Sequence, residues 1–92
     1  MTFTLSTIPK INPAIASTIV EAEAVVVNPQ KGKVNVFNPV GTFIWENIDG
    51  QQSLKMIVAA VCDEFAVDSE TAVTDALQFI ASLVERDIVT LG

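Results

Sequence analysis

The chain has 92 residues, half of them hydrophobic, and a formal net charge of −6 at pH 7. This length corresponds to one domain with a small core. No apolar run approaches the roughly 20 residues of a membrane helix, and no basic segment followed by a long apolar stretch indicates a secretory signal. A single cysteine, Cys62, cannot form an internal disulfide. We therefore expect a cytoplasmic protein that does not contact a membrane.

The first part of the chain predicts an arm followed by strands. Residues 1–13 contain two prolines and no hydrophobic period, which indicates a flexible N-terminal arm before a domain at 14–92. The segments 15–20 and 24–28 are rich in β-branched residues and predict a hairpin. A turn at Asn-Pro-Gln-Lys-Gly then leads into a third strand at 33–37. This predicts a three-stranded antiparallel meander.

Three helices follow the strands. Asn38 is the expected N-cap of the first helix, with Pro39 at its first position, and Asp49-Gly50 is expected to end it. Ser53 and Asp68 are the expected N-caps of the second and third helices. The closing segment, residues 88–91, either adds a short strand or lies under the helices. The sequence thus predicts an α+β, winged-helix-like fold, with a three-stranded antiparallel sheet followed by three helices.

The predicted third helix has a broader apolar surface than one neighbour requires. Its expected core stripe is Val73, Ala76, Leu77, Ile80 and Val84. A flank beside that stripe adds Ala72, Ala76, Phe79 and Leu83. Together these residues span an arc of about 160°, against about 100° or more for a usual core-facing stripe. Such an arc either contacts two neighbouring elements or leaves one flank, bordered by Asp75 and Arg86, for a partner.

The residue types do not favour catalysis. The chain has no histidine and no tyrosine, so the commonest general base and metal ligand are missing. Acidic pairs such as Asp63-Glu64 are too sparse for a metal cluster, and the four glycines form no phosphate-binding loop. Cys62 has no basic neighbour to activate it. We expect no enzyme activity, no metal and no cofactor.

Single features of the sequence suggest two other functions. Asp68-Ser69 at a helix start is similar to the Asp-Ser-Leu site of acyl carrier proteins, where Ser69 would receive phosphopantetheine. A strand-rich first half does not suit a four-helix carrier, and a helix cap explains the same residues. A winged-helix DNA-binding domain would carry basic or amide side chains on its recognition helix. The segment from Glu46 onward instead carries nine acids against Lys55 and Arg86, so we expect no nucleic-acid partner.

Several motifs resemble those of one family. The run Phe37-Asn38-Pro39-Val40-Gly41, followed by Ile44-Trp45-Glu46 and Ile48-Asp49-Gly50, resembles the signature of the PqqD-like proteins, named after the D protein of pyrroloquinoline quinone biosynthesis. Phe65-Ala66-Val67-Asp68 and the ending Asp87-Ile88-Val89 are similar to later parts of that pattern. Asp87 stands where the family commonly has glycine. The resemblance covers roughly residues 14–90.

The resemblance implies a non-catalytic recognition domain for ribosomally synthesised precursor peptides. Such domains bind the leader of the precursor as an antiparallel strand beside the third strand, in a groove bordered by the third helix. They present it to a maturation enzyme, such as a radical S-adenosylmethionine enzyme or a leader protease. The resemblance also permits a homodimer.

Two features of the residues agree with this implication. The third strand is at the edge of the predicted meander, so it offers unpaired backbone groups for strand addition. The wide flank of the third helix would supply side-chain selectivity. The expected peptide-binding residues are Lys33, Val34, Asn35, Val36 and Phe37 on the strand, with Ala72, Asp75, Ala76, Phe79 and Leu83 on the helix.

Overall fold

The structure is a computed structural model that describes residues 4–91. Its strands are β1 (Pro9–Ile11), β2 (Ala16–Val20), β3 (Glu23–Asn28), β4 (Lys33–Val36) and β5 (Val89–Leu91). Its helices are α1 (Pro39–Glu46), α2 (Leu54–Phe65) and α3 (Ser69–Glu85). This is the predicted α+β, winged-helix-like arrangement, with a second, two-stranded sheet added. No helix among the described residues is long and apolar enough to cross a membrane.

The larger sheet has the order β2-β3-β4, with both pairs antiparallel, as the sequence predicts. Asn28 forms the β3–β4 turn: its side-chain oxygen accepts from the N–H of Gln30 at 3.0 Å, and its carbonyl accepts from Gly32 at 2.9 Å. Gly32 takes a positive φ of 64°, which glycine adopts without steric cost. The turn therefore fixes the position of β4.

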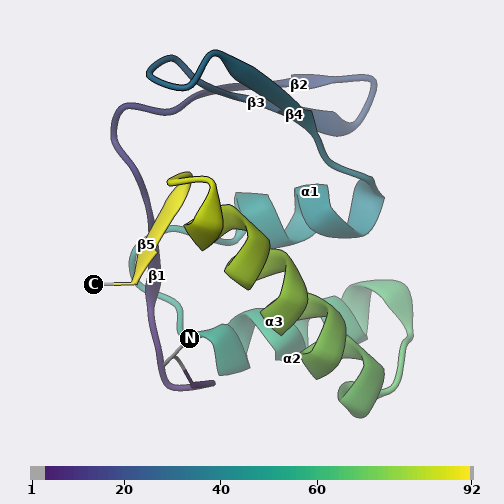
Figure 1. Ribbon diagram of the computed structural model, residues 1–92. Coiled ribbons are helices and arrows are strands. Elements are labelled where there is room, and N and C mark those ends of the chain that lie inside the picture. The colour runs from purple at the N-terminus through teal and green to yellow at the C-terminus, as the bar shows by residue number, and fades with distance from the viewer. Residues whose placement is uncertain (1–3, 92) are drawn as a thin grey trace.

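The helices cover only one face of this sheet, as Figure 1 shows, with the sheet above α1 and α3. On the covered face, Ala24 and Val26 of β3 are fully buried. On the other face, Val20, Val34 and Val36 are 51%, 63% and 61% exposed. The alternation along the strands thus places one set of side chains in the core and leaves valines outside.

All three helices begin at the predicted caps. Side-chain oxygens of Asn38, Ser53 and Asp68 accept from the N–H groups of Gly41, Met56 and Thr71 at 2.8, 3.3 and 3.3 Å. The end of α1 differs from the prediction, because α1 stops at Glu46 rather than at Asp49-Gly50. The side-chain oxygen of Asp49 instead accepts from the N–H groups of Gln51 and Gln52, so Asp49 belongs to the following loop.

The N-terminal segment is held at several points. β1 pairs antiparallel with β5, and the two lie side by side in Figure 1. The first-turn N–H groups of Leu54 and Lys55 donate to the carbonyls of Thr7 and Leu5, each at 2.9 Å, which satisfies donors that have no partner within α2. The sequence predicted no secondary structure here, so this pairing was missed. Of the two alternatives for the C-terminal segment, the structure has the short strand, β5. Residues 1–3 of the predicted arm lie outside the described residues, and the domain boundary at 14 stays a prediction.

The buried face of α3 is rotated from the predicted one. Its buried residues are Ala72, Ala76, Ile80 and Leu83. Val73, Leu77 and Val84, predicted as core, are only half-buried against it. The prediction that Ala72, Ala76 and Leu83 leave an open flank is therefore wrong, since their side chains are 2%, 1% and 0% exposed.

Candidate functional site: the groove beside β4

One edge of the larger sheet is open. β4 pairs with β3 on one side and has no neighbour on the other among residues 4–91. Figure 1 shows β4 and α3 both at the front of the molecule, with α3 below the sheet. The β1–β5 pair forms a separate sheet, so the described part of the N-terminal segment, from residue 4, does not occupy the β4 edge. The edge is thus available to an added strand.

The phase of the β3–β4 ladder decides which backbone groups are free. The N–H of Phe37 donates to the carbonyl of Ala24 at 2.9 Å, so this is a hydrogen-bonded pair. Such pairs alternate in an antiparallel ladder, and the next ones are Val26 with Asn35 and Asn28 with Lys33. The N–H and C=O groups of Val34 and Val36 therefore point away from β3, toward the open edge. Two residues with two groups each offer a guest strand four backbone hydrogen bonds.

A hollow lies where β4 ends and α1 begins. It has a volume of about 340 Å³ and is lined by Asn38, Val40, Gly41, Ile44, Asp75 and Phe79; we call it the Phe79 hollow. The half-buried Phe79 ring contacts Phe37 edge-on, with centroids 4.9 Å apart. A Cβ at position 41 would lie 3.0 Å from Cε1 of Phe79, so glycine lets α1 approach this ring closely. The hollow thus combines the apolar side chains of Val40 and Phe79 with the polar side chains of Asn38 and Asp75.

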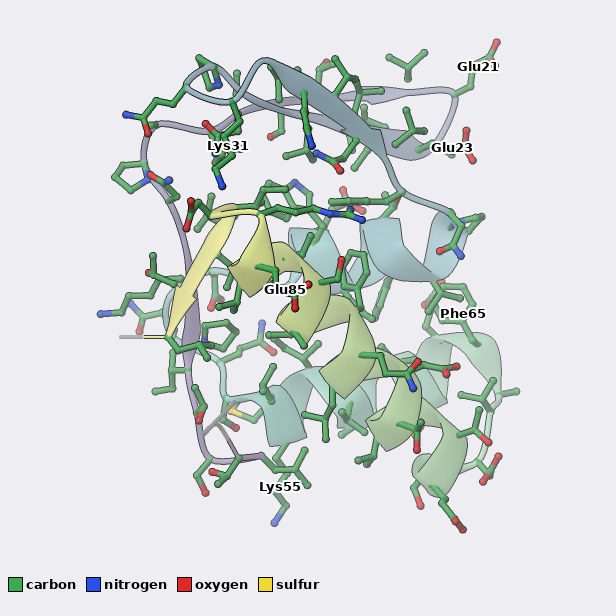
Figure 2. The ribbon with its side chains drawn as sticks, in the orientation of Figure 1. Glu21, Glu23, Lys31, Lys55, Phe65 and Glu85 are labelled. Carbon is green, nitrogen blue, oxygen red and sulfur yellow. The ribbon has the colours of Figure 1, made fainter. Side chains whose placement is uncertain are left out.

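A second hollow lies at the start of β4. It measures about 400 Å³ and is lined by Asn28, Lys31, Lys33, Val34, Asn35, Glu85 and Arg86; we call it the Arg86 hollow. The Arg86 guanidinium donates to Oδ1 of Asn35 at 2.9 Å, joining the end of α3 to β4. Figure 2 shows Lys31 above the C-terminal end of α3, and Glu85 on its last turn. The open edge therefore runs between a hollow that contains an aromatic ring and a carboxylate and a hollow lined by three basic residues.

The predicted site residues divide into two groups. Those at the surface are Lys33, Val34, Asn35 and Val36 on β4, and Asp75 and Phe79 on α3. Those in the core are Phe37, Ala72, Ala76 and Leu83. The contact set that we propose below contains the first group only. Phe37 takes part indirectly, because it supports the Phe79 ring.

Sequence reasoning missed several lining residues. Val40 and Gly41 were noted only as motif residues, and Arg86 only as a border of the α3 flank. The one local signal for the Phe79 hollow was a glycine inside a helix, which usually has a packing reason. Nothing local indicated the contact between Arg86 and Asn35, which are 51 positions apart.

The groove offers binding groups rather than reactive ones. Among residues 4–91, no three His, Cys, Asp or Glu side chains gather as metal ligands. The two carboxyls with a lowered pKa are Asp49, which accepts hydrogen bonds in the loop after α1, and Asp68, which accepts them as the N-cap of α3; neither lines a hollow. Cys62 is a half-buried free thiol on α2. The arrangement is suited to holding an extended chain by its backbone and alternate side chains.

Residues 23–89 match the family described as Coenzyme PQQ synthesis protein D (PqqD). The chain belongs to the PqqD family. The match includes β3, β4 and all three helices, so both sides of the groove lie within the PqqD region. Among curated proteins, no sequence matches.

Two solved structures resemble this PqqD-family chain over most of its length. One is TbiB1 in complex with the TbiA(beta) leader peptide, with a TM-score of 0.81 and 29% identity, covering 87% of this chain and 93% of that one. The other is a lasso peptide synthetase B1 complexed with the leader peptide, with a TM-score of 0.81 and 17% identity, covering 90% and 98%. The second likeness shows the shared fold alone.

Proposed function

We propose that this chain is a non-catalytic, cytoplasmic module that binds the leader of a ribosomally synthesised precursor peptide and presents it to a maturation enzyme. The leader adds as a strand to β4, with side chains entering the groove against α3. The observation that supports this most strongly is the open β4 edge, with two hollows beside it. Membership of the PqqD family and the likeness to TbiB1, solved with a leader peptide, support the same function.

The groups at the edge are sufficient for useful affinity. Four backbone hydrogen bonds contribute about 0.5–1.5 kcal/mol each. An apolar leader side chain buried in the Phe79 hollow adds about 1.5–3 kcal/mol. These contributions must exceed the cost of ordering the leader, which is several kcal/mol. The net is at most about 7 kcal/mol, which corresponds to a dissociation constant of about 10 μM or weaker.

The direct test begins by finding the peptide. The chain is immobilised and used to select from a library that displays the short open reading frames of its source genome. The proposal predicts enrichment of a precursor whose leader region alone binds, measured by fluorescence anisotropy. If no short reading frame is enriched, or if the bound part is the core peptide rather than the leader, the proposed function is wrong.

The place of binding is tested with two phenylalanine variants. Phe79→Ala removes the ring that lines the hollow, and we expect leader affinity to fall about tenfold or more. Phe65→Ala is the matched control: Phe65 is also half-buried and also packs edge-on, with its centroid 5.4 Å from that of Phe43, but it lines neither hollow. It lies at the end of α2, at the right of Figure 2.

Both variants lose part of one aromatic pair, so we expect similar decreases in stability of about 1–2 kcal/mol. Leader affinity should distinguish the two variants, because only Phe79→Ala should reduce it strongly. Equal loss of leader affinity in the two variants would mean that the effect of Phe79→Ala comes from a weakened fold and would contradict the proposed contact.

A further inference from the structure

Positive charge on this acidic chain gathers at one place. The net charge is −6, yet three of its five Lys and Arg residues, Lys31, Lys33 and Arg86, line the Arg86 hollow. Lys31 is paired with Asp87, its Nζ 2.9 Å from the carboxylate, and Glu85 is the acidic residue among those that line the hollow. Lys33 and Arg86 therefore remain as cations at the side of the open strand.

Arg86 is held in place with donors to spare. A guanidinium has five N–H donors, and the Arg86 side chain uses one of its nitrogens for the bond to Oδ1 of Asn35. Within residues 4–91, no other hydrogen bond from this side chain is present. The Asn35 bond orients the guanidinium beside β4. A planar guanidinium fixed in this way is suited to binding a carboxylate through two parallel hydrogen bonds.

The other end of the groove has the opposite charge. Asp75 borders the Phe79 hollow, whose other lining residues are uncharged. A carboxylate on a guest strand would be repelled there and attracted at the Arg86 hollow. An apolar guest side chain has the reverse preference, because the Phe79 hollow offers an aromatic ring, a valine and an isoleucine. The two ends therefore discriminate between guest residues.

The strand geometry converts this difference into a spacing and a direction. Lys33, Asn35 and Phe37 are the hydrogen-bonded positions of β4 and alternate with the outward-facing Val34 and Val36. Both existing pairs of this sheet are antiparallel. An antiparallel guest would place one residue opposite Phe37, next to the Phe79 hollow, and the residue four positions later opposite Lys33, on the same face.

We propose that the leader carries an apolar anchor followed about four residues later by an Asp or Glu, and that Lys33 and Arg86 bind that carboxylate. This inference rests on the proposed function and specifies the chemistry of its ligand. Lys33 and Arg86 are specificity residues in this proposal, whereas the anchor and the β4 backbone supply most of the affinity.

The test is a selection from random strand-length peptides, carried out with the wild-type chain, Lys33→Gln and Arg86→Gln. Lys55→Gln is the matched control, because it removes a lysine on α2, which Figure 2 shows at the bottom of the molecule, away from the sheet. Wild type and Lys55→Gln should enrich an apolar residue followed four positions later by Asp or Glu. Either groove variant should reduce the acidic enrichment and retain the apolar one.

Affinities then quantify the contact. The affinities of a selected peptide and of its Glu→Gln version are measured by fluorescence anisotropy. The wild-type chain should bind the Glu peptide about tenfold more tightly than the Gln peptide. For the Lys33→Gln, Arg86→Gln double variant, the two affinities should differ by less than about twofold. Lys33→Gln alone keeps the Arg86–Asn35 bond, so it remains informative if Arg86→Gln alters the fold.

The outcomes separate this inference from the function on which it rests. Selected peptides with the apolar anchor but no acidic preference, or with the acid before the anchor, would overturn the inference and leave leader binding intact. An acidic preference that persists in both Lys33→Gln and Arg86→Gln would also overturn the inference and leave leader binding intact. Failure to enrich any peptide, together with failure of the genome-derived selection, would instead reject the proposed function.

Discussion

The Thr42 hydroxyl, in the first turn of α1, donates to the carbonyl oxygen of Phe37 at 3.2 Å, and Phe37 directly precedes the N-cap of that helix. The hydroxyl oxygen of Thr42 also accepts from the N–H of Ala24 at 2.9 Å. Thr42 thus lies at the end of the β3–β4 ladder, and its hydroxyl pairs with the N–H of Ala24 and the C=O of Phe37, which do not bond to each other. This side chain is 5% exposed, so water does not replace it readily.

Replacing Thr42 by Val should therefore destabilise the fold. The substitution keeps the shape of the side chain but leaves a buried N–H and a buried C=O without partners, which costs about 2–4 kcal/mol. Urea unfolding followed by circular dichroism measures this. Thr74→Val is the control, because Thr74 is exposed on α3 and donates only to the carbonyl of Glu70. A change in the control as large as that in Thr42→Val would contradict the assignment.

We predict that a substitution in the β2–β3 turn can increase the stability of the fold. Glu21 and Ala22 both have positive φ, 51° and 69°, a conformation that costs a non-glycine residue roughly 1–2 kcal/mol. Two-residue hairpin turns of this kind prefer glycine at the second position. Ala22→Gly should raise the free energy of unfolding by about 0.5–1 kcal/mol. Gly32→Ala, at φ 64° with open space around it, should lower it by about 1 kcal/mol. Leader binding should not change in Ala22→Gly.

The cap of α3 should show in the pH dependence of stability. Hydrogen bonds from the Thr71 side chain and N–H lower the pKa of Asp68 from its usual 3.8. A carboxyl with a lower pKa in the folded state stabilises the fold above its unfolded pKa, and this contribution is lost as the pH falls through the folded value. Asp68→Asn keeps a cap without a charge. Its melting temperature should lie below that of wild type at pH 7 and approach it by about pH 2. A difference that stays constant with pH would contradict this.

Features with local signals were predictable from the sequence. Asn38, Ser53 and Asp68 each precede an apolar-periodic segment, and each is the observed cap. The turn at Asn28–Gly32 and the open third strand follow in the same way from turn residues and a meander with two edges. Asp87, where the family commonly has glycine, has a positive φ of 58° after α3, which explains why glycine suits that position.

Features that depend on distant contacts were not predictable. The apolar arc of α3 is wide enough to permit several rotations, and its packing against elements distant in sequence, α2 and β5, places Ala72 and Leu83 in the core and Leu77 at its border. The β1–β5 pair joins residues about 80 positions apart, through an arm whose prolines gave no strand signal. The Arg86–Asn35 contact likewise has no local pattern.

Proline at the open edge tests strand addition itself. The N–H of Val36 points away from β3, so Val36→Pro removes a donor to the guest while the β3–β4 ladder keeps its bonds. We expect leader affinity to fall about fivefold or more, with a modest decrease in melting temperature. Ile19→Pro is the matched control on the opposite edge: residues 23, 25 and 27 of β3 bond to β2, so Ile19 also points outward. If Ile19→Pro weakens leader binding as much as Val36→Pro does, the guest strand is not bound at β4.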